Sequence, residues 1–232
     1  MERNEINGWL NINKPYGFSS AKVVAIIKRI LKAKKVGHGG TLDPLAVGVL
    51  PICINKATKT TEKTMGFTKE YLFDITFGEL RSTADAEGEV IDKNDKIPTD
   101  IEITNILDKF IGDIKQIPPI YSAIKINGKR AYELARENKD IELEERDVKV
   151  YNLEFLGFQN KDTARFLVKC GKGFYVRSLA VDIVKTLNTV GYVSYLERKS
   201  VGIFNQDNII TLEEFEKIVK DNVLEKYLII IE

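Results

Sequence analysis

Segments with the period of a β-strand are interleaved irregularly with segments that have the period of an α-helix, and this order limits the chain to a mixed fold. Residues 47–54 form a continuous apolar run, which predicts a buried strand. In residues 71–77, the apolar side chains of Tyr71, Phe73, Ile75 and Phe77 stand at every second position, which is the period of a half-buried strand. Residues 176–187 instead carry apolar side chains at helical spacing. Because strict strand–helix–strand alternation is missing, we expect an α+β protein with a mixed sheet.

Weaker local signals complete this outline. Ser19 and Ser20 can cap a helix that runs to about Ala33, and Thr211 with Glu214 forms a capping box for a last helix. The other expected elements are a loop over 81–90, a short helix that follows Pro98 and Thr99 and stops near Gly112, an excursion over about 117–147, and strands over 148–158, 164–170 and 192–204.

Composition excludes several classes of protein. A chain of 232 residues with 44% hydrophobic and 30% charged residues can bury a core, and it is neither disordered nor fibrous in composition. The longest apolar run, residues 46–54, is far shorter than the roughly 20 residues that span a bilayer. The start of the chain lacks the features of a secretory signal. Cys53 and Cys170 show no metal-binding spacing, so we expect two buried thiols and a cytoplasmic protein.

Charge is distributed unevenly although the formal net charge is only +1. Six cations and no acid lie between Lys22 and Val36, whereas acids collect in later segments. A basic face of this kind can attract phosphates. The solvated side of an amphipathic helix explains the same pattern, and charge alone favours that explanation.

Conventional catalytic patterns are missing. The chain has one histidine, which rules out a multi-histidine metal site, and we find no sequence pattern that supplies this histidine with the partners of a Ser-His-Asp triad. The glycine turns at 37–40 and 171–173 lack the spacing of a phosphate-binding loop. They allow tight backbone turns, and the first would present Asp43 closely to a ligand. By itself, an Asp-Pro dipeptide is more typical of a turn than of a nucleophile.

Seven segments of the chain form a recognisable series. In order they are GWLNINKPYGFSSAKVV, KKVGHGGTLDPLAVGVLPI, KEYLF, STADAEG, QIPPIYSAIKINGKRAYE, KGFYVRSLAVDI and YLERKSVG. Taken together, they resemble the TruB family of tRNA pseudouridine synthases. The resemblance extends from about Gly8 to about Leu212, and its GHxGxLDPxAxGxLP element is long enough to be highly specific.

The resemblance implies a catalytic role for Asp43, as nucleophile or as base. It also implies that Arg177 pairs with Asp43, since a guanidinium favours an ionised carboxylate. Tyr71 matches the tyrosine that stacks on the flipped base, with its hydroxyl a candidate for proton transfer. Tyr175 and Leu196 match positions in the pocket wall. From the residues alone, Arg177 would be a structural ion pair and Tyr71 a core aromatic.

Further positions are assigned to the pocket or to RNA by the same resemblance. Asp85 corresponds to a polar position near the pocket, although an exposed loop acid is nearly as plausible. His38 matches a residue that wedges into the RNA loop, and its alternative is an ordinary turn residue. The cations expected to contact RNA are Lys14, Lys22, Lys28, Lys35, Lys125, Lys129, Arg130 and Lys172.

The resemblance implies an α+β protein with the pseudouridine synthase fold, in which helices flank a mixed, mostly antiparallel central sheet. We expect one catalytic domain over 1–232, an RNA-clamping insertion at about 117–147, and no C-terminal PUA domain. The expected reaction converts uridine 55 in the T loop of tRNA to pseudouridine after base flipping. It needs no metal or cofactor, and we expect a monomer without an obligate protein partner. The alternatives are a tRNA folding helper and a guide-dependent, dyskerin-like enzyme.

Overall fold

The computed structural model describes residues 6–122, 124–126, 128–137 and 143–231. The chain divides into two compact units. Unit 1 comprises Met1–Glu70 and Glu197–Glu232, and unit 2 comprises Tyr71–Leu196. The expected single catalytic domain and its insertion remain predictions, since a division by compactness does not test either of them.

Unit 1 is built on strands β1 (Gly8–Lys14) and β3 (Val47–Ile54), which pair antiparallel along their length. The short strand β2 (Val36–His38) pairs with the other edge of β3 at its far end, and the last part of β12 (Gly191–Val201) pairs with β3 in parallel. The helices of this unit are α1 (Ser20–Leu31), α2 (Thr61–Gly66), α6 (Leu212–Lys220) and the 3-10 turns Asn55–Thr60, Gln206–Asn208 and Leu224–Tyr227.

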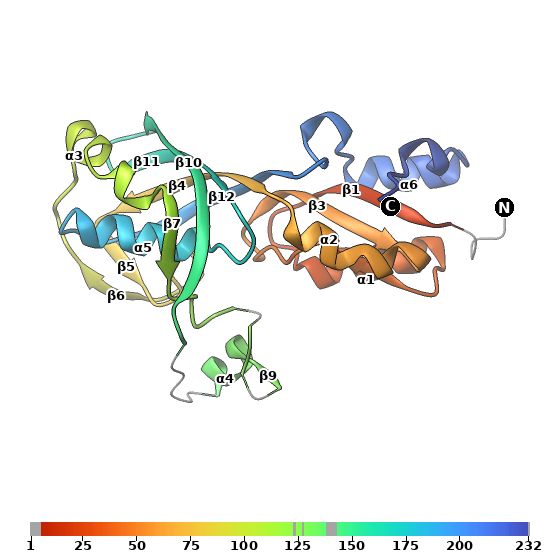
Figure 1. The fold of residues 1–232 in the computed structure, drawn as a ribbon, viewed down its shortest axis with the longest axis horizontal. Helices are drawn as coiled ribbons and strands as arrows, with labels where there is room; N and C mark the ends of the chain where they lie inside the picture. Colours follow the sequence, from red (N-terminus) through yellow and green to blue (C-terminus); the bar gives the residue numbers. More distant parts are fainter. Residues whose placement is uncertain (1–5, 123, 127, 138–142, 232) are drawn as a thin grey trace. The chain divides into compact units, whose positions relative to one another are not determined.

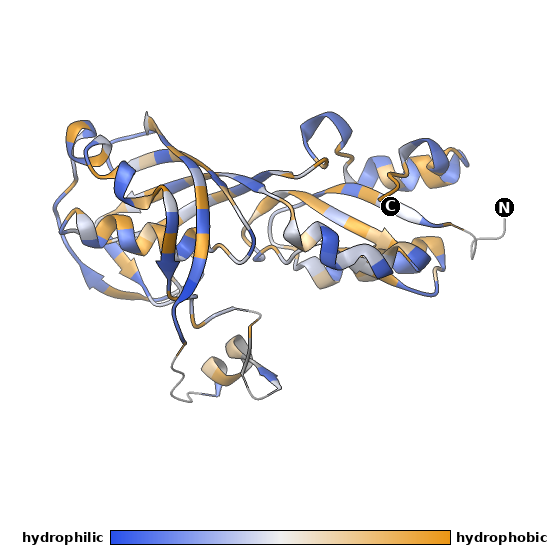
Figure 2. Ribbon diagram, in the orientation of Figure 1, coloured by the Kyte–Doolittle hydropathy of each residue, from blue (hydrophilic) through white to orange (hydrophobic). Residues whose placement is uncertain are grey.

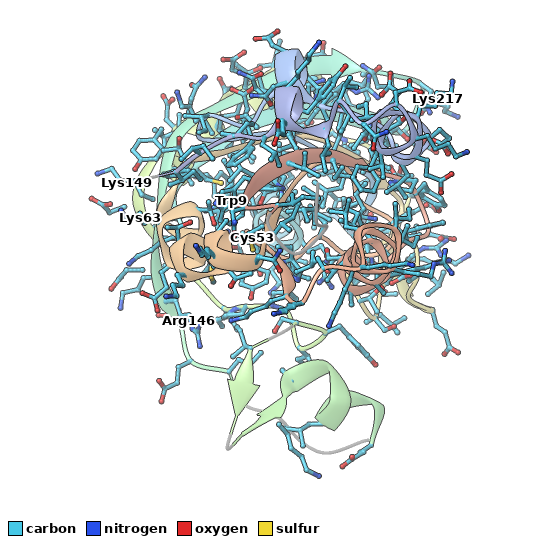
Figure 3. The ribbon with its side chains drawn as sticks, turned by 90° about the vertical axis from the view of Figure 1, so that its right-hand side faces the viewer. Trp9, Cys53, Lys63, Arg146, Lys149 and Lys217 are labelled. Atoms are coloured by element: carbon cyan, nitrogen blue, oxygen red, sulfur yellow. The ribbon has the colours of Figure 1, made fainter. Side chains whose placement is uncertain are left out.

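The core of unit 1 includes cross-strand partners from β1 and β3. Trp9 lies opposite Cys53, and both are fully buried. Figure 3 shows the two in the interior, whereas Lys217 of α6 lies at the periphery. Burial raises the pKa of the Cys53 thiol, which keeps it protonated and unreactive. Hydrophobic residues occupy most of β3 in Figure 2, as the apolar run predicts.

Unit 2 contains the rest of an eight-stranded sheet whose order is β1-β3-β12-β4-β11-β10-β7, with β2 attached to β3. Apart from the parallel β3–β12 pair, the described registers are antiparallel. Helix α5 (Val176–Thr186) lies against the part of the sheet formed by β4, β11 and β10, and its buried apolar residues belong to the same hydrophobic core (Figure 1). The expectation of an α+β fold with a mixed, mostly antiparallel sheet is confirmed.

The bounds of the elements in this unit follow. The sheet strands are β4 (Lys69–Phe77), β7 (Gly112–Gln116), β10 (Arg146–Phe158) and β11 (Thr163–Cys170). Two hairpins are β5 (Glu79–Arg81) with β6 (Val90–Lys93), and β8 (Lys125–Ile126) with β9 (Lys129–Arg130). The remaining helices are α3 (Asp100–Thr104), the 3-10 turn Leu107–Phe110 and α4 (Ala131–Arg136).

Several local expectations need correction. The segment 81–90, expected to be a loop, starts and ends in the β5–β6 hairpin. The one short helix expected between Thr99 and about Gly112 starts after Thr99 as expected, but it is split into α3 and a 3-10 turn. Asp74 is buried on β4, against the simple alternation, because the Arg165 guanidinium binds its carboxylate bidentately at 2.7 and 2.8 Å.

Among the described residues, the helices are all too short or too polar to cross a membrane.

Candidate active site

Asp43 lies on the loop that connects β2 to β3, and this loop is fixed by hydrogen bonds on both sides of the aspartate. On the N-terminal side, the Ser20 hydroxyl donates to the Leu42 carbonyl oxygen (3.1 Å) and accepts from the Leu42 amide (2.9 Å). On the C-terminal side, the Ala46 amide donates to the Asp43 carbonyl oxygen at 3.1 Å. Ser20 is buried at the start of α1. The backbone therefore holds the half-buried Asp43 in one defined place.

Lys14 was expected to contact RNA, but its side chain is buried against the loop that carries Asp43. Its side chain is fully buried, and its ammonium donates to the carbonyl oxygens of Pro15 (3.0 Å), Phe18 (2.5 Å) and Pro44 (3.0 Å). A buried cation needs such polar partners to offset its lost hydration. Because Pro44 directly follows Asp43, the ammonium ties the end of β1 to the loop that carries the aspartate.

Arg198 is a second buried cation on the same loop, and the sequence analysis did not single it out. Its guanidinium donates to the carbonyl oxygens of Val49 (2.8 Å) and Gly40 (3.0 Å), with Thr41 at 3.5 Å. Gly48 packs against the backbone of Arg198, where an added Cβ would lie 2.4 Å from the Arg198 carbonyl oxygen. Gly48 also has a φ of +96°, so only glycine fits there. The loop is thus clamped between Lys14 and Arg198.

The other sequence-predicted residues of unit 1 are His38, whose role in wedging RNA remains a prediction, and a group of exposed lysines. His38 ends β2, and its Nδ1 accepts a weak hydrogen bond from the Gly40 amide at 3.4 Å. Lys22, Lys28 and Lys35 are all exposed on or just after α1. Their exposure fits either explanation of the basic segment, a phosphate-binding face or the solvated side of an amphipathic helix.

Arg177 occupies the first turn of α5, as the sequence predicts, and is 4% exposed. Its Nη1 lies 3.5 Å from an Asp85 carboxylate oxygen and donates to the Thr83 carbonyl oxygen at 3.1 Å. Its Nη2 donates to the Tyr121 carbonyl oxygen at 2.8 Å. Within unit 2, the structure therefore gives Arg177 a carboxylate partner that the sequence did not assign to it. The expected pairing of Arg177 with Asp43 remains a prediction, because the two residues belong to different units.

Asp85 is buried and structurally committed, so it is not an exposed loop acid. Its carboxylate accepts from the Thr83 hydroxyl (2.5 Å) and the Glu87 amide (3.0 Å). Its backbone forms a bridge with Val193 of β12. These contacts fix the segment 82–88 against β12 and place the acid beside Arg177.

Gln116, at the end of β7, fixes the beginning of α5 and was missed in the sequence. Its side-chain oxygen accepts from the Tyr175 amide (3.1 Å), and its side-chain nitrogen donates to the Tyr175 carbonyl oxygen (3.3 Å). The Ser178 hydroxyl donates to the Ile117 carbonyl oxygen at 2.7 Å. With the bond from Arg177 to Tyr121, four hydrogen bonds therefore join the chain at 116–121 to the beginning of α5.

Tyr71 and Leu196 lie on neighbouring strands, β4 and β12. Both are partly buried and pack at the margin of the unit 2 core, as does Phe174. The structure therefore brings Tyr71 and Leu196 to the same core that packs α5, while Tyr175 at the N-cap of α5 is half-buried.

The remaining cations of unit 2 are less informative. Lys172 is exposed. Lys129 lies on β9 and its ammonium is 3.9 Å from Glu137. Lys125 and Arg130 lie on β8 and β9, and their side chains fall outside the described part of the chain. Over the described residues, no three His, Cys, Asp or Glu side chains come together in a way that could bind a metal ion.

Comparison with known proteins relates the chain to a family. Residues 28–176 match the sequence profile described as "TruB family pseudouridylate synthase (N terminal domain)". A protein of Ehrlichia canis named "tRNA pseudouridine synthase B" is 48% identical over 96% of this chain and 74% of its own length. The chain belongs to the TruB family. Its Rickettsia felis relative of the same name is 46% identical over 94% of this chain and 65% of its own length.

A solved structure supports the fold of this TruB family member. A chain in "Crystal Structure of a Cbf5-Nop10-Gar1 Complex" is 30% identical, with a TM-score of 0.74, and the match covers 95% of this chain and 57% of that one. The expectation of a pseudouridine synthase fold and of an isomerase is confirmed. The sequence contains the residues on which the TruB resemblance rests, and the roles assigned to these residues remain predictions.

Proposed function

We propose that this chain isomerises uridine 55 in the T loop of tRNA to pseudouridine, with Asp43 as the catalytic group. The observation that carries the proposal is 48% identity, over nearly the whole chain, to a protein named for tRNA pseudouridine synthesis. The reaction breaks the bond between C1′ and N1, turns the base, joins C1′ to C5, and moves the C5 proton to N1. It is redox-neutral and consumes no second substrate.

The reaction needs an extruded base, because the target atoms are inaccessible in a stacked RNA loop. Flipping costs a few kcal/mol, which contacts in the pocket offset. We assign stacking on the base to Tyr71, and the adjoining wall to Tyr175 and Leu196. Asp43 acts as nucleophile or base in its ionised form. The rigid loop supports this role, since a catalytic group must be held close to its productive geometry.

The test uses the purified chain, an unmodified tRNA transcript and no added cofactor. Pseudouridine is mapped by carbodiimide treatment and primer extension. We expect one carbodiimide-dependent stop, at the nucleotide directly 3′ of position 55. Absence of product with a correctly folded transcript would refute the proposed activity, and product formed only after addition of a guide RNA would favour the guide-dependent alternative.

Arg177 provides a sharper test of the site in unit 2. We expect Arg177→Lys to lose most of the single-turnover rate, because one ammonium cannot replace the fork that contacts Asp85, Thr83 and Tyr121. Arg165→Lys is the matched control, since Arg165 forms its ion pair with Asp74 in the same unit and has no proposed role in the reaction. A rate near that of the wild type for Arg177→Lys would exclude a specific role for the guanidinium.

A further inference from the structure

The turn between β1 and α1 displays a large aromatic side chain to solvent. Tyr16 is 65% exposed, although its neighbours Lys14 and Ser20 are buried. A single exposed aromatic residue is common on protein surfaces and is no site by itself. Tyr16 differs from such residues because the turn that carries it is hydrogen-bonded to the loop of Asp43.

Two hydrogen bonds to one acceptor make this attachment. The Pro44 carbonyl oxygen accepts from the Gly17 amide at 2.9 Å and from the Lys14 ammonium at 3.0 Å. Tyr16 is thus one residue from a backbone group bound directly beside Asp43. The Pro15 ring restricts the backbone before Tyr16, and Gly17 adopts a φ of +76° after it. The backbone that carries the Tyr16 ring is therefore fixed relative to the loop of Asp43, which belongs to the same unit.

The segment from Tyr16 into the first turn of α1 contains the two chemistries that bind looped RNA. The Lys22 ammonium lies 3.8 Å from the centre of the Phe18 ring, and Lys22 is exposed. The first turn of α1 contains no acidic residue that would repel a phosphate. Proteins that bind unpaired nucleotides pair such cations with exposed aromatic rings on which bases stack.

We propose that Tyr16 is an RNA-contact residue on which an unpaired nucleotide near the target uridine stacks, while Lys22 binds an adjacent phosphate. This inference rests on the proposed function, since it names a second contact of the same RNA. The braced turn sets the position of the stacked nucleotide relative to the Asp43 loop. Tyr16 therefore contributes to binding and to orientation of the RNA, and it takes no part in the chemistry.

The test compares Tyr16→Ala with Tyr16→Phe and with a matched control, Tyr227→Ala, which removes another exposed tyrosine of unit 1. Binding of unmodified tRNA transcript and steady-state kinetics are measured for each full-length variant. We expect Tyr16→Ala to weaken binding and to raise KM on the order of ten-fold, with little change in kcat. Tyr16→Phe keeps the ring and stays close to the wild type, as does Tyr227→Ala.

Two outcomes would overturn the inference. Wild-type binding by Tyr16→Ala would show that the ring does not contact RNA, and the same loss with Tyr16→Phe would show that stacking is not the cause. If Lys22→Met weakens binding while Tyr16→Ala does not, phosphate attraction alone accounts for this surface. Failure of the proposed function is distinguishable, because in that case the wild-type chain forms no pseudouridine whatever the variants bind.

Discussion

Asp43→Asn is expected to bind unmodified tRNA within a few fold of the wild type and to form no pseudouridine. The amide has the size of the carboxylate, so the loop held by Ser20, Lys14 and Arg198 keeps its conformation. It can act neither as the nucleophile nor as the base that the reaction requires. Single-turnover product formation and equilibrium binding are measured on the same preparation.

The matched control is Asp207→Asn, which makes the same change at an exposed position of unit 1. We expect this variant to equal the wild type in both measurements. Product formed at a normal rate by Asp43→Asn would refute the catalytic assignment. Loss of tRNA binding together with activity would instead assign Asp43 to RNA recognition. A folding-helper role would persist in Asp43→Asn, so the same variant separates that role from catalysis.

Elements with strong local signals could be predicted from the sequence with accurate bounds. The apolar run at Val47–Ile54 is the strand β3. The capping box of Thr211 and Glu214 is present, with Thr211 accepting from the Glu214 amide at 3.1 Å and Glu214 accepting from the Thr211 amide at 2.7 Å. Signals of this kind depend on residues a few positions apart, so the sequence alone is sufficient to find them.

Strand β1 was missed because its buried polar residues depend on distant partners. Asn11 is fully buried, and its side-chain amide donates to the Asn205 carbonyl oxygen (2.8 Å) and to the Asn208 side chain (2.6 Å). Lys14 can be buried because its ammonium donates to carbonyl oxygens, among them that of Pro44. Neither residue fits an alternating apolar pattern, and nothing near them in the sequence reveals these partners.

The same limit applies to the site. The family motifs locate Asp43, Tyr71 and Arg177, but motif spacing says nothing about which acid lies beside which cation. Asp85 and Arg177 are far apart in the chain, and only the fold shows the 3.5 Å between their charged groups. Gln116 was missed for a similar reason, since an amide that brackets the backbone of Tyr175 has no signature in the sequence.

Arg198→Met is expected to lower the free energy of unfolding by about 3 kcal/mol and to reduce activity at temperatures where the protein stays folded. Methionine fills much of the space but donates no hydrogen bond. The carbonyl oxygens of Val49 and Gly40 then lose a partner, and each unsatisfied buried group costs about 1–3 kcal/mol. Activity falls because the loop of Asp43 is held on one side only. Urea denaturation and the single-turnover rate provide the two measurements.

Lys199→Met is the matched control, because it alters the next residue along β12 and removes only a partly exposed ion pair with Glu197 (3.0 Å). Such surface pairs contribute at most about 1 kcal/mol, so this variant should unfold close to the wild type. Arg198→Lys should lie between Arg198→Met and the wild type, since an ammonium reaches some of the carbonyl oxygens but cannot bridge them as the planar fork does. If Arg198→Met unfolds at the same urea concentration as Lys199→Met and retains full activity, the loop does not depend on the clamp, and Lys14 with Ser20 must suffice to fix Asp43.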